Sequence, residues 1–280
     1  MSQSDPALLV VLVVLCGVLG TIIGSFLNVV IWRLPRGESL SHPGSACPKC
    51  GHPIRWWDNV PVLSWLLLRG RCRDCSEPIS PRYPIVEFGT GVFFAVIAWW
   101  LLVVLTPTMP FAAAVLAAVA YLFLGSISVA LGLIDLDTHR LPNVIVGPGY
   151  IVGAVLLTAS SLVSGDLESL LRAAIGMASL FLGYLVMILV YPAGMGLGDL
   201  KLAGMLGLFL GWLGWGPLLV GAFAAFLLGG VFALVLLVLR RASRKSAIPF
   251  GPWMIVGAWV GVFLGEPILV GYLALFGLGI

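Results

Sequence analysis

The sequence predicts an all-α polytopic membrane protein, with about eight transmembrane helices and one small polar loop domain. Hydrophobic residues make up 60% of the 280 residues, and charged residues make up only 10%. A soluble domain carries about 25% charged residues. The apolar residues are also gathered in runs long enough to cross a bilayer, which takes about 20 residues of helix. These observations exclude a soluble globular chain.

The first apolar run predicts a transmembrane helix rather than a cleaved signal peptide. Asp5 precedes the run, whereas no Lys or Arg does. The run then continues to about Trp32, which is too long for the apolar core of a signal peptide. We therefore expect the first helix to remain part of the protein.

The later apolar runs predict seven further helices. A short, glycine-rich one starts after Lys201 and breaks near 214–217. The others lie at about 86–105, 111–133, 144–163, 170–190, 218–239 and 253–278. The chain is thus divided into a first transmembrane helix at 1–32, a loop domain at 33–84 and a seven-helix membrane domain at 85–280.

The basic residues predict that both termini lie outside and the loop domain lies in the cytoplasm. Eight of the fifteen Lys and Arg residues fall in the 33–84 loop alone. In this orientation every Lys and Arg except Arg172 lies on the cytoplasmic side, as the positive-inside rule requires. The same orientation puts Asp135, Asp137 and Asp199 at the cytoplasmic membrane boundary.

Four cysteines of the loop domain form two close pairs, Cys47-Pro-Lys-Cys50 and Cys72-Arg-Asp-Cys75, with 21 residues between them. Four thiolates give Zn²⁺ a closed tetrahedral shell, which stabilises a small loop but leaves no position open for catalysis. The alternative is two disulfides, which a reducing cytoplasm disfavours. Three further residues are expected to be ordinary loop or packing residues: His42, His52 and Cys16.

Residues 194–201 read Gly-Met-Gly-Leu-Gly-Asp-Leu-Lys and stand out within otherwise apolar sequence. The glycines permit unusual backbone angles and the close approach of another segment. An ionisable residue beside a membrane span is costly and therefore indicates a functional site. The alternative is a short loop in which Asp199 and Lys201 are solvated at a helix end.

A second acidic group, Asp135-Leu-Asp137, ends the third predicted helix. Pro142 cannot continue a helix, and Asn143 is expected to cap the next one. Two carboxylates held close together can share one proton, so that one acts as a base on water while the other polarises a carbonyl. The alternative is a polar loop with solvated charges, which fits Asp137 better than a catalytic role does. His139 is expected to be a loop residue.

Two other classes of protein fit the sequence less well. A transporter is expected to carry charges in mid-helix and an inverted repeat, whereas the charges here cluster at one face. A metal-binding scaffold without chemistry would leave Asp135 and Asp199 unexplained. Serine-hydrolase, zinc-protease and nucleotide-binding motifs are missing from the sequence, and no nucleic-acid partner is expected.

Five motifs follow one another along the chain. They are Gly24–Pro35 in the first helix, the cysteine quartet, Asp135 with Leu141-Pro142-Asn143, Gly196-Leu-Gly-Asp199, and Pro249-Phe-Gly-Pro252. In this order they resemble the motifs of the type IV prepilin peptidases, the bifunctional leader peptidase/N-methyltransferases of the GxGD aspartic protease class. Trp253 departs mildly from this pattern, since many members carry Phe there.

The resemblance implies an enzyme of the bacterial inner membrane. Its substrates would be prepilins or pseudopilins of a type IV pilus or a type II secretion system. Each has a short basic leader before a hydrophobic helix. Cleavage would follow a glycine at the cytoplasmic face, and S-adenosylmethionine would then methylate the new N-terminal residue. The implied catalytic pair is Asp135 and Asp199. Glu87 is a candidate for the methyl-donor site, and membrane lipid is a further partner.

Overall fold

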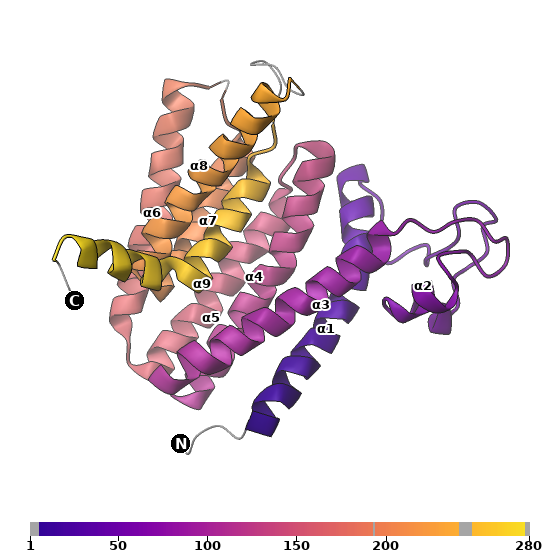
Figure 1. The fold of residues 1–280 in the computed structure, drawn as a ribbon, viewed down its shortest axis with the longest axis horizontal. Coiled ribbons are helices and arrows are strands. Elements are labelled where there is room, and N and C mark those ends of the chain that lie inside the picture. Colours follow the sequence, from indigo (N-terminus) through magenta and orange to yellow (C-terminus); the bar gives the residue numbers. More distant parts are fainter. Residues whose placement is uncertain (1–5, 193, 241–247, 278–280) are drawn as a thin grey trace. The chain divides into compact units, whose positions relative to one another are not determined.

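The computed structural model describes residues 6–192, 194–240 and 248–277. Within these ranges helices carry the fold, and no β-strand is present (Figure 1). Seven helices of the described chain are long and apolar enough to cross a membrane. The predicted all-α polytopic membrane fold is thus confirmed.

These seven helices correspond to seven of the eight predicted segments. They are α1 (Pro6–Arg33), α3 (Arg82–Trp100), α4 (Phe111–Thr138), α5 (Asn143–Ser164), α6 (Leu167–Val190), α8 (Trp215–Val238) and α9 (Gly251–Leu275). A π-helical turn at Leu101–Leu105 and a 3₁₀ turn at Thr106–Thr108 extend α3.

The remaining predicted segment is α7 (Leu197–Leu213), which has 17 residues and is shorter than the seven spans. It begins at Leu197, whereas the sequence predicted a start after Lys201, so both Asp199 and Lys201 are helical. The Gly-x-Gly spacing had suggested a loop, but Gly196 serves as the cap of this helix. The helix ends at Leu213, and Gly214 alone separates it from α8.

The chain is divided into two compact units. The first comprises Met1–Thr108 and Tyr121–Ala130, and the second comprises Met109–Ala120 and Leu131–Ile280. Helix α4 contributes to both units, and both Asp135 and Asp199 belong to the second.

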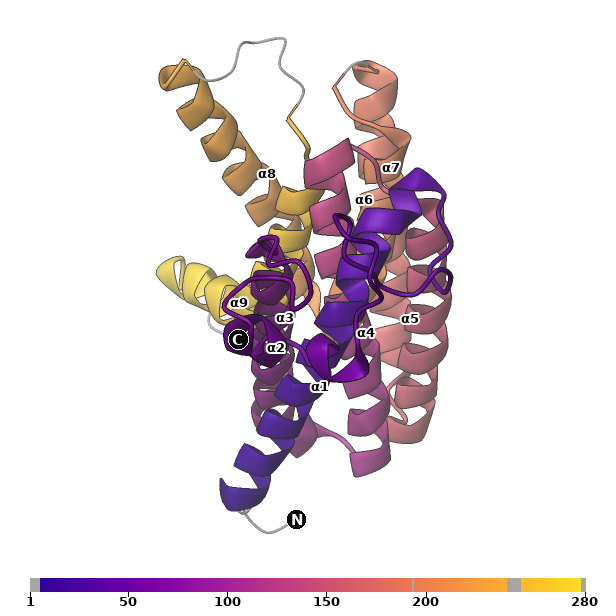
Figure 2. The same cartoon turned by 90° about the vertical axis from the view of Figure 1, so that its right-hand side faces the viewer.

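In the first unit, α1 and α3 approach each other through small residues. A Cβ on Gly20 would lie 2.7 Å from the Thr90 carbonyl oxygen, and one on Gly91 would lie 2.5 Å from Thr21 Cγ2. Small residues allow this close packing of membrane helices. The loop that joins the two helices carries the short helix α2 (Leu63–Leu67; Figures 1 and 2), and it is hydrogen-bonded to α3 at Glu87.

In the second unit, α7 is surrounded by other helices and buried along most of its length. A Cβ on Gly207 would lie 2.3 Å from the Gly176 carbonyl oxygen of α6, so the two backbones touch. Leu202 and Phe209 are fully buried. Because α7 is fixed in this way, the polar residues of its first turn are held in place.

Candidate active site

Asp135 lies three residues before the end of α4, and its side chain is buried, with 5% of the residue exposed. Its Oδ2 atom accepts a hydrogen bond from the backbone N–H of Gly251, the first residue of α9, at 3.1 Å. A Cβ on residue 251 would lie 2.6 Å from the same oxygen. Glycine is therefore needed for the start of α9 to reach this carboxylate.

Asp199 lies in the first turn of α7 and is partly exposed. Its Oδ2 atom accepts a hydrogen bond from the backbone N–H of Gly196 at 3.0 Å. This bond is the side-chain half of a capping box, which satisfies a backbone donor that the helix itself cannot pair. The carboxylate is thereby fixed at a helix N-terminus, where the helix dipole favours negative charge.

The side chain of Leu141 lies between the residue before Asp199 and the residue that is hydrogen-bonded to Asp135. A Cβ on Gly198 would lie 3.1 Å from Leu141 Cβ, and one on Gly251 would lie 3.3 Å from Leu141 Cδ2. Gly198 directly precedes Asp199, and Gly251 is hydrogen-bonded to Asp135. The two carboxylates consequently lie within electrostatic range of each other.

Three aromatic side chains, from α6, α8 and the residue before α9, form a cluster in the second unit. The ring centroids of Tyr184 and Phe226 are 5.5 Å apart, and those of Phe226 and Phe250 are 5.3 Å apart. Phe250 directly precedes Gly251, whose N–H is bonded to Asp135. The aromatic cluster therefore adjoins the backbone segment that is hydrogen-bonded to Asp135.

Three other polar residues lie close in sequence to the two aspartates: Asp137, Asn143 and Lys201. Asp137 is exposed, although it lies only two residues from buried Asp135. Lys201 donates a hydrogen bond from Nζ to Asn143 Oδ1 at 3.0 Å, and its backbone carbonyl accepts one from Tyr150 Oη at 2.7 Å. Asn143 is thus the first residue of α5 and a partner of Lys201, rather than the helix cap predicted from the sequence.

The two cysteine pairs form turns of the same design. Cys47 donates its N–H to the His52 carbonyl at 3.0 Å, and Gly51 donates its N–H to the Cys47 carbonyl at 2.9 Å. Cys72 and Ser76 make the equivalent bonds in the second turn. Gly51 and Ser76 have φ angles of 70° and 60°, a left-handed conformation that ends each turn tightly.

The four sulfur atoms of the quartet gather at one point. The Sγ atoms of Cys47, Cys50, Cys72 and Cys75 all lie within 4.8 Å of one another, and those of Cys47 and Cys75 are 3.7 Å apart. All four thiols are free. Disulfide sulfurs are about 2.05 Å apart, whereas Zn–S bonds of about 2.3 Å in a tetrahedron place the sulfurs about 3.8 Å apart. The geometry fits Zn²⁺ and does not fit two disulfides.

The thiols of the cluster have pKa values shifted in opposite directions, since burial and hydrogen bonds with the other three thiols raise the pKa of Cys75 to about 12. The backbone N–H groups of Cys50 and Lys49 lower the pKa of Cys47 to about 7. A lower pKa favours the thiolate, which is the form that binds metal.

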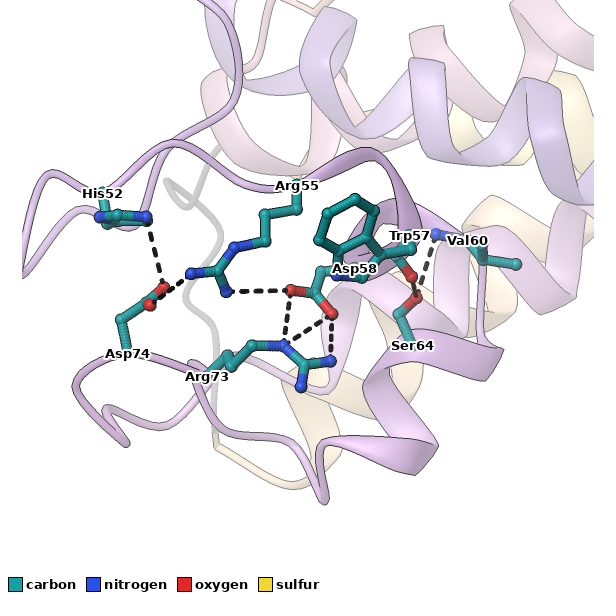
Figure 3. A network of polar contacts seen from close by, with 8 residues as sticks. All are labelled: His52, Arg55, Trp57, Asp58, Val60, Ser64, Arg73 and Asp74. Carbon is teal, nitrogen blue, oxygen red and sulfur yellow. Dashed lines mark hydrogen bonds and ion pairs between the residues drawn. The ribbon is translucent and has the colours of Figure 1, made fainter.

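Ion pairs connect the two cysteine turns (Figure 3). Arg55, after the first pair, lies 3.0 Å from Asp74 of the second, and Arg73 Nε donates to Asp58 Oδ2 at 2.8 Å. The hydrogen bond from Arg73 lowers the pKa of Asp58. Ser64 of α2 is bonded to the turn that carries Asp58. The loop domain is therefore linked by charged groups as well as by its cysteines.

Comparison with known proteins identifies the family. A model described as the type IV leader peptidase family matches residues 122–234, which include both aspartates. One described as the bacterial peptidase A24 N-terminal domain matches residues 18–101, which include the cysteine quartet. A Pseudomonas putida protein named prepilin leader peptidase/N-methyltransferase is 36% identical over 288 residues, and the match covers 95% of both chains. The chain belongs to the type IV leader peptidase family.

Other relatives in the type IV leader peptidase family carry the same name. The Pseudomonas aeruginosa protein is 34% identical over 294 residues, which cover 94% of each chain. The Neisseria gonorrhoeae protein is 36% identical over 274 residues, which cover 88% of each chain. No solved structure matches the chain significantly.

Two contacts in this leader peptidase family member were not predicted from its sequence. One joins Gly251 to Asp135 across 116 residues, and the Pro249–Pro252 motif was the signal that could have indicated it. In the other, Glu87 Oε2 accepts the Val62 N–H at 2.7 Å. Glu87 is buried, and Val62 has a φ of 62°, which is unfavourable for a β-branched residue. Glu87 thus holds a strained turn of the loop domain.

Proposed function

We propose that this chain is a membrane aspartic endopeptidase that removes the leader of type IV prepilins or pseudopilins. Cleavage follows a glycine at the cytoplasmic face of the bacterial inner membrane, and the new N-terminal residue is then N-methylated. Membership of the leader peptidase family and the names of the relatives support this assignment. The structural observation that carries it is the proximity of Asp135 and Asp199 around Leu141.

The helix ends suggest which carboxylate plays which role. Asp199 lies in the first turn of α7, where the helix dipole stabilises a negative charge. The Gly251 N–H at the start of α9 also favours a charge on Asp135, but this side chain is the more buried of the two and lies in the last turn of α4, and both of these conditions disfavour its charged form. We therefore assign Asp199 as the base and Asp135 as the protonated acid.

These roles account for hydrolysis of the peptide bond. Asp199 takes a proton from water while the water oxygen attacks the carbonyl carbon of the glycine, and Asp135 gives its proton to the carbonyl oxygen. When the C–N bond breaks, Asp199 passes its proton to the leaving amine. The hydroxyl formed on the carbonyl oxygen returns its proton to Asp135. Both carboxyl groups end in their starting states.

The second activity needs a methyl donor. S-adenosylmethionine would supply the methyl group to the amine that cleavage releases. Glu87 is the candidate residue from the motif comparison, but its Oε2 atom already accepts the Val62 N–H. We therefore propose a structural role for Glu87.

The loop domain at 33–84 is proposed to bind one Zn²⁺ through Cys47, Cys50, Cys72 and Cys75. A shell of four thiolates leaves no site for substrate, so the metal stabilises the loop rather than reacting. The distribution of Lys and Arg supports placing this loop and both aspartates on the cytoplasmic side, with both termini outside.

Purified protein in detergent, mixed with a candidate prepilin, tests this function. Mass spectrometry should show loss of the leader, and one added methyl group when S-adenosylmethionine is present. The Asp199→Asn variant, with its zinc content unchanged, should leave the prepilin intact. Leader loss at the same rate with this variant would refute the aspartic mechanism.

A further inference from the structure

The short helix α2 exposes an unusual apolar face. Leu63 and Leu66 are each 58% exposed, and Leu67 is 83% exposed. Each step of an α-helix turns about 100°, so these three side chains lie within about 100° of one another. Trp56, in the turn that packs beside α2, is 79% exposed. A contiguous apolar surface of this kind indicates an interaction site.

The opposite face of α2 is fixed to the loop domain. Ser64 donates a hydrogen bond to the Trp57 carbonyl at 3.0 Å, and Trp65 Nε1 donates one to the Ile79 carbonyl at 3.1 Å. The backbone N–H of Val60 in turn donates to Ser64 Oγ (Figure 3). Because these bonds set the rotation of α2, its leucines are held outward by the fold.

The contact between Val62 and Glu87 sets the position of α2 along the membrane helix α3. Val62 directly precedes α2, and Glu87 lies in the second turn of α3, a candidate span that starts at Arg82. On α3, Ile85 is 66% exposed and Phe88 is 60% exposed. The leucine face of α2 therefore begins at the level where α3 starts to expose apolar side chains.

Basic residues follow directly after the leucines. Arg69 and Arg71 are exposed and line a cavity of about 550 Å³ together with Leu67. Within the described chain, neither arginine forms an ion pair. The neighbouring acids Asp58 and Asp74 form ion pairs with Arg73 and Arg55, respectively (Figure 3). A positive, unneutralised edge thus adjoins the apolar face.

We propose that α2 anchors the loop domain to the bilayer surface that α3 enters. Leu63, Leu66 and Leu67 enter the boundary between headgroups and acyl chains, and Arg69 and Arg71 bind the phosphates of anionic lipids. Trp56 suits the same position, because Trp is enriched at membrane interfaces. A basic peptide fits this surface poorly, since the 33–84 loop carries eight basic and four acidic residues and would repel it.

Spin-label accessibility in nanodiscs tests this proposal on the full chain. A label attached at position 67 through a non-canonical amino acid leaves the cysteines untouched, and a label at exposed Pro53 is the matched control. In bilayers that contain anionic lipid, the label at 67 should collide several-fold more often with oxygen than with a water-soluble nickel complex. The label at 53 should show the reverse. Equal nickel access at both positions, or shielding at 67 that arises only when a prepilin is added, would overturn the proposal.

The arginines are tested with the same label. Replacing anionic by zwitterionic lipid should raise nickel access at position 67. The paired change Arg69→Gln and Arg71→Gln should make this access insensitive to lipid charge, with zinc content as the check on folding. Unchanged sensitivity to lipid charge in that variant would contradict phosphate binding by these two residues.

Discussion

Two carboxylates near the end of α4 have opposite surroundings. Asp135 is 5% exposed and bonded to Gly251, whereas Asp137 is exposed. Helix α4 continues to Thr138, so both residues are helical. Residues two positions apart on a helix point about 200° away from each other. Only one of the two side chains can therefore face Asp199.

We expect Asp135→Asn and Asp199→Asn each to reduce cleavage by several orders of magnitude, because Asn cannot take or give the shared proton. The double variant should be little worse than either single one, since residues that act as a unit are not additive. Asp137→Asn should keep most of the activity. Cleavage rates at matched expression and zinc content measure this. An inactive Asp137→Asn beside an active Asp135→Asn would show that the wrong aspartate was assigned.

Gly251 offers a second test, which leaves both carboxylates in place. A Cβ at this position would lie 2.6 Å from Asp135 Oδ2, so Gly251→Ala should displace the carboxylate. A misplacement of about 1 Å can lower a rate on the order of a hundredfold. Gly271→Ala in the same helix is the control, because nothing lies within 4 Å of a Cβ there. Equal cleavage rates for the two variants would argue against a role for the Gly251 contact.

At the scale of elements, the loop domain depends on its cysteines, because its hydrophobic core is small. Cys50→Ser should lose the bound zinc and disorder the two turns, with an indirect loss of cleavage. Metal analysis of the purified protein measures the zinc directly. Cys16→Ser is the control, since this free thiol lies in α1, away from the quartet. Full zinc content in Cys50→Ser would remove that residue from the ligand set.

Glu87 connects the loop domain to α3, and two substitutions separate its possible roles. Glu87→Leu leaves the part-buried Val62 N–H without its acceptor, which should cost about 1 kcal/mol, the low end for an unsatisfied donor. Cleavage and methylation should then fall together. Glu87→Gln keeps an oxygen acceptor and should retain both activities. If Glu87→Gln instead abolishes methylation alone, then Glu87 serves the methyl donor.

At the scale of the whole molecule, the sequence predicted the features that depend on local patterns. The spans were predicted because a bilayer requires long apolar runs, and the cysteine cluster because the spacing of the cysteines is specific. The predicted start of α7 was wrong. Gly196-Leu-Gly198 is also typical of loops, and the helix start there is marked by the capping bond from the Gly196 N–H to Asp199. The contacts of Asp135 with Gly251 and of Glu87 with Val62 join distant segments. The local pattern of apolar and polar residues does not predict contacts between distant segments.

The orientation of the molecule leads to the last prediction. In a background without Cys16, single cysteines at Thr108 and Phe276 should react with an impermeant thiol reagent added to intact cells. A cysteine at Ser41, in the 33–84 loop, should react only after the membrane is opened. We expect this pattern because Lys and Arg are concentrated in that loop, and the positive-inside rule predicts that such a loop stays in the cytoplasm.

The labelling result decides whether Asp135 and Asp199 can reach the leader of a prepilin. A short basic leader stays in the cytoplasm for the same electrostatic reason as the 33–84 loop. The aspartates can cleave the leader only from that side. Asp135 and Asp199 lie at the ends of α4 and α7 that Arg140 and Lys201 predict to be cytoplasmic. If Ser41→Cys were labelled in intact cells and Thr108→Cys were not, both carboxylates would face the wrong compartment, and leader cleavage by this pair would be ruled out.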